Sequence, residues 1–196
     1  ALAPQPALVL LDEPFTGLDA NLRAEVREQV LTALRAAGAT AVLVTHDQQE
    51  ALSAADLVAV LRDGRVTQIG PPREVYDRPV DVAVGTFVGE AVVLPATVHA
   101  GCAHTLLGAL PVDGPDGTGR VLLRPEQLRL TTDATTPVRG VVTQVLFYGH
   151  DATVVVEVDQ TKVRCRTGTD VPPVGSTVAV RVTGTGRFFP DPEPAR

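Results

Sequence analysis

The sequence predicts two parts of different architecture, an α/β layer with parallel strands over residues 1–89 and an all-β domain over residues 90–190. In the first part, strand-like and helix-like hydrophobic patterns alternate, which is typical of a parallel sheet with crossover helices. In the second part, short runs of β-branched residues are separated by Gly, Pro and Thr. Strands at this spacing favour a small β-barrel or sandwich. Gly and Pro residues place the boundary near residues 88–95.

The first predicted strand is a continuous apolar run at residues 7–11, which stops at Asp12. A short unbroken run is expected for a central strand that is buried on both faces. From Leu22 onward, apolar residues recur every four positions among charged ones, so an amphipathic helix is expected there. Gly38 is placed to end that helix, because glycine readily adopts the left-handed conformation of a helix C-terminus.

A second buried strand is predicted over residues 40–45, and it ends at His46. Residues 47–54 then form a helix whose first residue, Asp47, is suited to cap free backbone N–H groups. An Asp-Gly pair between two apolar runs next predicts a tight hairpin. The remaining elements expected in this part are the hairpin strands 57–61 and 66–69 and short helices at 73–76 and 80–87.

The second part is expected to contain strands only, because its β-branched residues alternate between turn signals. The clearest strand patterns are at residues 120–124, 138–146, 153–158, 162–167 and 177–183. Residues 191–196 are expected to be a frayed tail, since the last seven residues include three prolines.

Composition excludes several classes of protein. Of the 196 residues 44% are hydrophobic, which supports packed cores and argues against a disordered chain. The net charge of −6, divided as −5 over residues 1–89 and −1 over residues 90–196, argues against a broad nucleic-acid surface. The apolar runs fall far short of the ~20 residues of a membrane-spanning helix. Because the sequence contains no Met, we expect a processed chain or a piece of a longer one.

The two cysteines, Cys102 and Cys165, occur in isolated contexts. They match neither a disulfide framework nor a metal-ligand spacing, so we interpret them as small, partly buried residues in a reducing cytoplasm.

Two acids follow the first strand directly, at Asp12 and Glu13. Ligands of open α/β sheets bind beyond the carboxyl ends of the strands, so this position directs both carboxylates toward a candidate site. A carboxylate there can hold Mg²⁺ through a water molecule, and its neighbour can orient or deprotonate an attacking water. Two adjacent acids alone would equally fit a solvated strand end.

The sequence around these acids is more specific. Residues 10–19 read Leu-Leu-Asp-Glu-Pro-Phe-Thr-Gly-Leu-Asp, and residues 43–52 read Leu-Val-Thr-His-Asp-Gln-Gln-Glu-Ala-Leu. Together the two strings resemble the ATP-binding subunits of ATP-binding-cassette (ABC) transporters. The resemblance implies that ATP and Mg²⁺ are the cofactors of the intact subunit.

The same resemblance implies a role for four residues. Asp12 would end the Walker B strand and hold Mg²⁺ through water, and Glu13 would be the catalytic carboxylate. Asp19 would belong to the D-loop, which contacts a second subunit across the ATP-bound dimer, and His46 would be the switch histidine that approaches the γ-phosphate.

Each residue also has a structural interpretation. Asp19 can cap the following helix, and we expect it to do this in addition to any contact with a second subunit. His46 can be a strand-end histidine held by local contacts, although its flanking residues favour the phosphate-binding role. His99, His104 and His150 lack such a context, and we expect ordinary surface or core positions for them.

The resemblance also identifies motifs that the printed sequence does not hold. A Walker A loop, Gly-x-x-x-x-Gly-Lys-Ser/Thr, binds phosphates through backbone N–H groups and a lysine. The only lysine here, Lys162, lies in a predicted strand. The Leu-Ser-Gly-Gly-Gln signature and the Q-loop are missing too, and in this family they precede Walker B. We therefore expect the chain to be the C-terminal part of such a subunit, inactive by itself.

The second part narrows the resemblance to one group of importers. Residues 64–76 match the stretch that joins the ATPase domain to a C-terminal extension, and Leu-Arg-Pro-Glu-Gln-Leu at 123–128 matches an element within it. Residues 87–95 resemble the entry of that extension in iron-type members. Importers of the maltose, spermidine/putrescine and ferric-iron type carry such an extension, a regulatory TOBE-type domain similar to the oligonucleotide/oligosaccharide-binding (OB) fold.

Three classes of function follow from these patterns. The first is an ATP-hydrolysing import subunit on the cytoplasmic face of the membrane, with a second copy in a head-to-tail dimer, permease subunits and, indirectly, a solute-binding protein as partners. Ferric iron is the expected solute, with polyamine, sugar or another small solute as alternatives. The second is a regulatory or ligand-sensing module without catalysis. The third, a chromosome-maintenance ATPase, is disfavoured by the acidic balance, and no nucleic-acid partner is expected.

Overall fold

The computed structural model describes residues 6–131, 133 and 136–192. The chain divides into two compact units, residues 1–76 and 77–196, which we call unit 1 and unit 2 and describe separately. This division lies about a dozen residues before the boundary expected at 88–95. It coincides instead with the end of the stretch 64–76 that resembles an interdomain connection.

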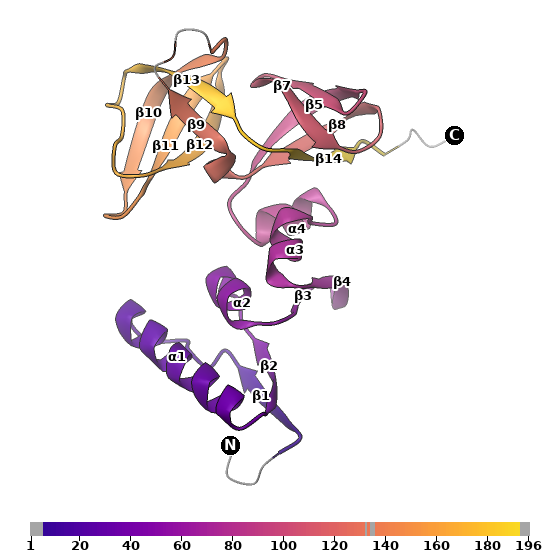
Figure 1. The fold of residues 1–196 in the computed structure, drawn as a ribbon, viewed down its shortest axis with the longest axis vertical. Helices are drawn as coiled ribbons and strands as arrows, with labels where there is room; N and C mark the ends of the chain where they lie inside the picture. The colour runs from indigo at the N-terminus through magenta and orange to yellow at the C-terminus, as the bar shows by residue number, and fades with distance from the viewer. Residues whose placement is uncertain (1–5, 132, 134–135, 193–196) are drawn as a thin grey trace. The chain divides into compact units, whose positions relative to one another are not determined.

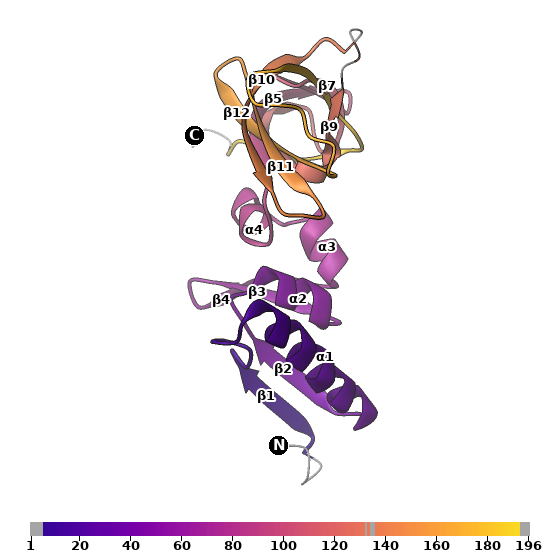
Figure 2. The same ribbon diagram turned by 90° about the vertical axis from the view of Figure 1, so that its left-hand side faces the viewer.

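Unit 1 is an α/β arrangement in which two parallel strands are joined by a helix (Figure 1). Strand β1 pairs in parallel with β2, and helix α1 forms the crossover along one face of the pair (Figure 2). The elements in chain order are β1 (Leu8–Asp12), α1 (Ala20–Ala36), β2 (Thr40–Val44), α2 (Gln48–Ala54), β3 (Val58–Arg62), β4 (Arg65–Gly70) and α3 (Pro72–Asp77). Helix α3 crosses the division between the units.

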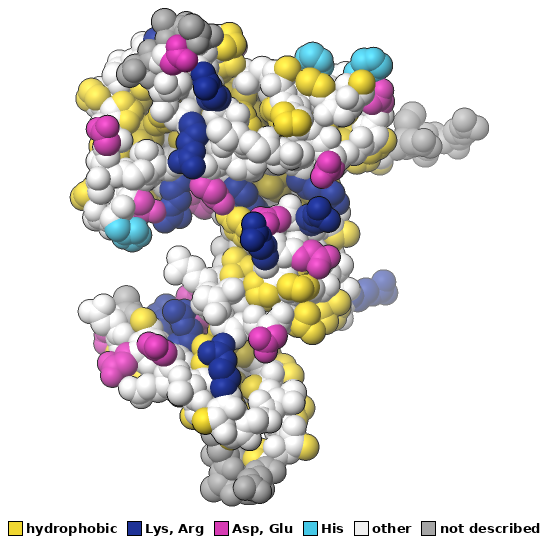
Figure 3. Space-filling view, viewed as in Figure 1, with side chains coloured by type: hydrophobic (Ala, Val, Ile, Leu, Met, Phe, Trp, Pro, Cys, Tyr) yellow, Lys and Arg dark blue, Asp and Glu magenta, His cyan; other side chains and the backbone are white. Residues whose placement is uncertain are grey.

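The parallel pair is covered on one face only. On β1, Val9 is 5% exposed, whereas Leu10 is 72% exposed. On β2, Val42 and Val44 are also exposed. The prediction that both strands are buried on both faces is therefore wrong for the described residues, because α1 supplies cover from one side while the other side has no layer over it. Hydrophobic side chains accordingly reach the surface in the lower part of Figure 3.

Local signals in unit 1 are confirmed by the structure. Asp19 caps α1 and Asp47 caps α2, each through a side chain that accepts from backbone N–H groups of the first turn. Gly38 follows α1 with φ at +59°, the left-handed conformation expected after a helix. Asp63 and Gly64, with φ at +52° and +73°, form the turn between β3 and β4, as the Asp-Gly pair predicts.

Unit 2 contains a short helical segment followed by two β-modules, where the sequence predicted one barrel. The helical segment ends with α4 (Val82–Phe87). The first module is a closed barrel in the order β14-β7-β6-β5-β8. Its strands are β5 (Val92–His99), β6 (Cys102–Thr105), β7 (Gly108–Asp113), β8 (Gly117–Leu123) and β14 (Gly186–Pro190).

The second module is a five-stranded sheet in the order β12-β11-β10-β13-β9. A 3-10 turn, η1 (Pro125–Gln127), leads into it. Its strands are β9 (Leu128–Thr131), β10 (Arg139–Phe147), β11 (Ala152–Val158), β12 (Thr161–Thr167) and β13 (Thr177–Val182). The chain then returns to the first module, where β14 closes the barrel between β7 and β8. Buried side chains of both modules form one apolar cluster.

Helix α4 belongs with the first module, because a buried arginine, Arg124, attaches it to the barrel. Arg124, 5% exposed at the end of β8, donates from Nη1 to the carbonyl oxygens of Gly85, Gly89 and Glu90. Gly85 also lies so close to the side chain of Leu122 that a Cβ atom at residue 85 would require Leu122 to shift. A boundary at 88–95 would separate these groups, so the Gly and Pro residues there mark a turn inside unit 2.

The expected tail lies largely outside the described residues, since the last four positions, 193–196, are not described. Before them, the backbone N–H of Asp191 donates to the carbonyl oxygen of Thr118 and continues the pairing of β14. Within the described residues, no helix is long and apolar enough to cross a lipid bilayer.

Candidate functional site

The site is built where β1 and β2 end. The two strands are parallel and adjacent, and Asp12 at the end of β1 is the register partner of Val44 at the end of β2. The pairing continues one residue further, because the backbone N–H of Glu13 donates to the carbonyl oxygen of Val44 over 2.8 Å. Residues that follow the two strands therefore emerge at the same edge of the sheet, as the sequence predicts.

Glu13 adopts an unusual backbone conformation at this edge. Its φ angle is +43°, in the left-handed region that residues other than glycine seldom occupy. The following turn is anchored by Phe15, whose side chain is 2% exposed. Thr16 donates from Oγ1 to Glu13 Oε2 over 3.2 Å and holds the carboxylate from one side. A left-handed residue held in this way is the kind of local strain that accumulates at functional sites.

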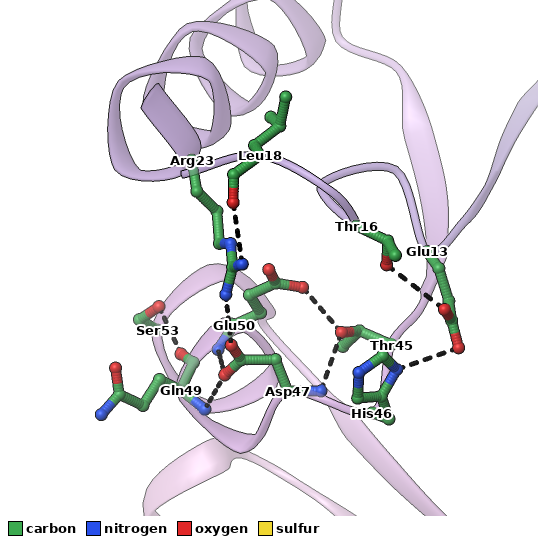
Figure 4. Close-up of polar contacts among 10 residues, drawn as sticks. All are labelled: Glu13, Thr16, Leu18, Arg23, Thr45, His46, Asp47, Gln49, Glu50 and Ser53. Atoms are coloured by element: carbon green, nitrogen blue, oxygen red, sulfur yellow. Dashed lines mark hydrogen bonds and ion pairs between the residues drawn. The ribbon is translucent and has the colours of Figure 1, made fainter. Parts of the chain in front are cut away.

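The structure brings Glu13 and His46 into direct contact. His46 Nδ1 lies 3.0 Å from Glu13 Oε1 (Figure 4). An ionised carboxylate only accepts hydrogen bonds, so the proton of this bond belongs to Nδ1. The His46 side chain is 74% exposed and that of Glu13 is 45% exposed. The pair is thus accessible to a ligand, and the second ring nitrogen of His46, Nε2, is not used in the contact.

The contact shifts the pKa values of the two residues in opposite directions. The hydrogen bond to Glu13, followed by its negative charge, raises the pKa of His46 above its ordinary value of 6.5. The charges of Asp47 and Glu50 add smaller shifts in the same direction. In return, the hydrogen bond and charge of His46 lower the pKa of Glu13. Each group therefore favours the charged form of the other.

The segment that carries His46 is fixed by hydrogen bonds on both sides of the histidine. Thr45 Oγ1 donates to Glu50 Oε2 over 2.6 Å and accepts from the backbone N–H of Asp47 over 3.0 Å. Asp47 Oδ1 in turn accepts from the backbone N–H groups of Gln49 and Glu50. Glu50 is 4% exposed, so this network is partly buried. Buried hydrogen bonds of this kind hold the backbone at His46 in one conformation.

The other two predicted residues lie near the pair without joining it. Asp12 is the last residue of β1, exposed and adjacent to Glu13. Asp19 Oδ1 accepts from the backbone N–H groups of Asn21 and Leu22 at the start of α1. Its capping role is therefore confirmed, and a contact with a second subunit stays a prediction.

The donors around Asp12 fit only one kind of metal site. Among the described residues, no group of three or more His, Cys, Asp or Glu side chains is arranged to hold a metal ion. An exposed single carboxylate suits Mg²⁺, which keeps several waters and is held by one or two carboxylates together with substrate phosphates. The residues present thus fit a water-mediated Mg²⁺ that arrives with a phosphate ligand, and they do not form a protein cage.

Sequence reasoning missed the supporting residues, Thr16, Arg23, Thr45 and Glu50. Of these, Thr16 and Thr45 lie inside the motif strings, so their proximity to Glu13 and His46 was the available signal. Arg23 reaches back from α1 to Leu18 and across to Asp47 (Figure 4). Nothing in the sequence distinguishes it from the other exposed arginines of an amphipathic helix.

The chain was compared with known protein families and proteins. The sequence profile of the TOBE domain matches residues 121–185. The Fe(3+) ions import ATP-binding protein FbpC 3 of Rhodococcus jostii (strain RHA1) is 50% identical over 161 residues, which cover 81% of this chain and 46% of that protein. The Fe(3+) ions import ATP-binding protein FbpC of Pseudomonas fluorescens (strain Pf0-1) is 43% identical over 202 residues, covering 98% of this chain and 58% of that protein. Over these shared lengths, the chain is similar in sequence to ferric-ion import ATP-binding proteins. It spans about half the length of the curated relatives that it matches.

The TOBE match begins in β8 and ends just before β14, so it contains the whole second module and only the last residues of one barrel strand. Its position confirms a TOBE domain within the β-rich part of the chain. A solved structure, the cytoplasmic molybdate-binding protein ModG with molybdate bound, aligns with 51% of this chain and 96% of its own, at 14% identity and a TM-score of 0.41. A similarity at that level establishes neither a common fold nor a common ligand.

Proposed function

We propose that this chain provides the hydrolytic centre and the TOBE domain of an ATP-hydrolysing subunit of an ABC importer. The observation that carries the proposal is the contact between Glu13 and His46 at the shared edge of β1 and β2. The names of the homologues, ferric-ion import ATP-binding proteins, support ferric iron as the solute. Polyamine, sugar or another small solute is the alternative that the sequence resemblance leaves open.

Glu13 is suited to act on an attacking water. Its carboxylate is ionised at neutral pH, since the ordinary pKa of the group is 4.5 and the contact with His46 lowers it further. Thr16 and His46 each occupy one carboxylate oxygen, and each oxygen has a second lone pair that can accept from a water. We infer that Glu13 orients this water and takes its proton, the role of a general base.

His46 is suited to bind a phosphate. In neutral imidazole with the proton on Nδ1, Nε2 can only accept, whereas the protonated ring also donates from Nε2. By raising the pKa of His46, Glu13 favours the protonated form. The pair therefore provides a hydrogen-bond donor for an anionic γ-phosphate next to a base for water.

Asp12 would hold the Mg²⁺ that accompanies ATP, through a water molecule. The ion, when bound, would neutralise charge on the phosphates. The printed sequence holds no Gly-x-x-x-x-Gly-Lys motif, so the proposal requires this phosphate-binding loop elsewhere in the polypeptide that carries the chain. The chain by itself is then expected to lack both ATP hydrolysis and detectable stabilisation by Mg-ATP.

The partners follow from the same proposal. A second copy of the subunit would pack head to tail, with Asp19 at the interface, and permease subunits would attach the pair to the cytoplasmic face of the membrane. A solute-binding protein would act on the complex indirectly. The two β-modules, which share one apolar cluster within unit 2, would serve as a regulatory domain.

The proposal is tested in the complete polypeptide that carries this chain, which we call the intact subunit. Replacing His46 with Ala removes one positioned hydrogen bond to developing charge and should lower turnover by about 10²- to 10³-fold. His104→Ala is the matched control, because it removes an exposed histidine of β6 that has no role in the proposal. A folded and fully active His46→Ala subunit would show that His46 has only a structural role.

A further inference from the structure

One arginine connects the two segments that carry the proposed site. Arg23 lies in the first turn of α1, and its Nη2 donates to the carbonyl oxygen of Leu18 over 3.0 Å. Its other terminal nitrogen, Nη1, lies 3.5 Å from Asp47 Oδ2. Leu18 belongs to the loop that begins with Glu13, and Asp47 directly follows His46. A single guanidinium thus contacts the loop of the acid and the segment of the histidine (Figure 4).

The two contacts use both terminal nitrogens of the guanidinium. Its terminal nitrogens point to different partners in a rigid fork, an arrangement that a lysine ammonium cannot reproduce. The Arg23 side chain is 38% exposed, and its Nε is buried without a hydrogen-bond partner among the described residues. The head group is therefore held between the two segments by its two terminal nitrogens.

Asp47 divides its carboxylate between two tasks. Oδ1 caps α2 through the backbone N–H groups of Gln49 and Glu50, while Oδ2 faces Arg23. Movement of Arg23 would therefore shift the residue next to His46 without removing the cap. On the other side, the carbonyl oxygen of Leu18 lies in the loop whose first residue is Glu13.

We propose that Arg23 is a positioning residue that holds the Glu13 loop against the His46 segment and thereby sets the contact between Glu13 and His46. Its importance for catalysis rests on the function proposed above. The positioning itself can be measured without ATP, in the chain as it stands.

The test uses the direction of a pKa change. Titration of the ring protons of His46 is followed by NMR in the parent chain and in Arg23→Gln. Besides Glu13, the charged groups that act on His46 are Asp47 and Glu50. Removing the positive charge of Arg23 without any movement leaves Asp47 uncompensated and can only raise the pKa of His46. If Arg23 holds the contact, Glu13 moves away and the pKa of His46 falls toward its ordinary value.

Two further variants complete this experiment. Arg27→Gln, one turn further along α1, removes the same charge at a residue that makes neither of the two Arg23 contacts, and it should leave the titration of His46 at the parent value. Arg23→Lys restores the charge without the fork and should give an intermediate pKa. The signals of His99, His104 and His150 serve as internal references.

An unchanged or raised pKa of His46 in folded Arg23→Gln overturns the proposal. So does full restoration by Arg23→Lys, since charge alone would then explain the effect. If Arg23→Gln loses the helical circular dichroism signal of unit 1, the comparison is made on Arg23→Lys, where a pKa at or above the parent value is the contradicting result.

A second readout separates this inference from the proposed function. In the intact subunit, Arg23→Gln should lower kcat by up to about 10²-fold with little change in KM, because misplacement acts on the chemical step. Arg27→Gln should retain normal turnover. A lowered pKa of His46 together with normal turnover would support the positioning role and contradict the hydrolytic role of the pair.

Discussion

Replacement of Arg124 by Met tests the observed organisation of unit 2. Arg124 is nearly fully buried, and its Nη1 donates to three carbonyl oxygens, of Gly85 over 2.8 Å, Glu90 over 3.1 Å and Gly89 over 3.2 Å. One NH₂ group has two protons, so at most two of these bonds are strong at a time. Methionine keeps most of the apolar stem and removes every donor.

The expected loss of stability follows from these contacts. A hydrogen bond to a charged group contributes about 1.5–3 kcal/mol, so losing two should cost roughly 3–5 kcal/mol after partial relaxation. For a unit of about this size, 1 kcal/mol shifts the melting temperature by roughly 4 °C, which gives a decrease of about 12–20 °C. The assay is thermal unfolding followed by far-ultraviolet circular dichroism, with limited proteolysis of residues 77–90 as a second probe.

The matched control is Arg120→Met, at an exposed position of β8, the strand that ends just before Arg124. It should change stability by no more than about 0.5 kcal/mol. If Arg124→Met melts like Arg120→Met and the segment 77–90 is equally resistant to protease, then α4 is not held by this arginine. The reasoning that places the division at residue 76 would then be refuted in favour of a boundary at 88–95.

Three further results are expected. Asp47→Ala should cost about 1 kcal/mol in denaturant unfolding, because α2 loses its cap, and an unchanged midpoint would contradict the capping role. The contribution of the Glu13 and His46 pair should be largest between their ordinary pKa values of 4.5 and 6.5. It should fade at higher pH, as His46 deprotonates through its raised pKa, and at lower pH, as Glu13 protonates through its lowered pKa. The difference in melting temperature between parent and Glu13→Gln across pH, at low salt, measures this, and a flat profile would refute it. Burial raises the pKa of Cys165 to about 12, so a thiol reagent should label only Cys102 in the native chain, and equal labelling would contradict that burial.

The sequence predicted the local structure of unit 1 well, because the signals there are local. Helix caps at Asp19 and Asp47 and the Asp-Gly turn depend on a few neighbouring backbone groups, and each is found as expected. Burial was predicted poorly. The apolar run of β1 predicted cover on both faces, yet cover depends on which segments pack against a strand, and the run itself does not specify them.

The β-rich part shows where strand patterns fail. The five expected strands are all present, whereas β5, β6, β7, β9 and β14 were missed. Strand β5 contains Pro95, which interrupts the strand pattern. Strand β14 lies directly before the expected frayed tail. The partner strands of β14, β7 and β8, lie more than sixty residues earlier in the chain. Closure by such a distant strand depends on long-range pairing, which hydrophobic periodicity does not contain.

For the site, the sequence predicted which residues carry the chemistry and not how they are held. The ends of two parallel strands predicted that Glu13 and His46 emerge together, and their side chains are in contact. The left-handed backbone at Glu13 and the bridge made by Arg23 required the structure, because each depends on the path of the loop between β1 and α1.

The central claim is that Glu13 is the base for hydrolysis, and Glu13→Gln in the intact subunit tests it most directly. The amide keeps the size and shape of the side chain and loses its basicity, so ATP turnover should fall by about 10²- to 10⁴-fold while ATP binding is retained. Turnover and ATP-dependent dimerisation are measured on the same preparation, with Glu25→Gln, an exposed acid on α1, as the matched control. The account predicts an inactive variant that still dimerises with ATP, beside a fully active control. Near-normal turnover in Glu13→Gln would contradict it and move the catalytic role to another residue.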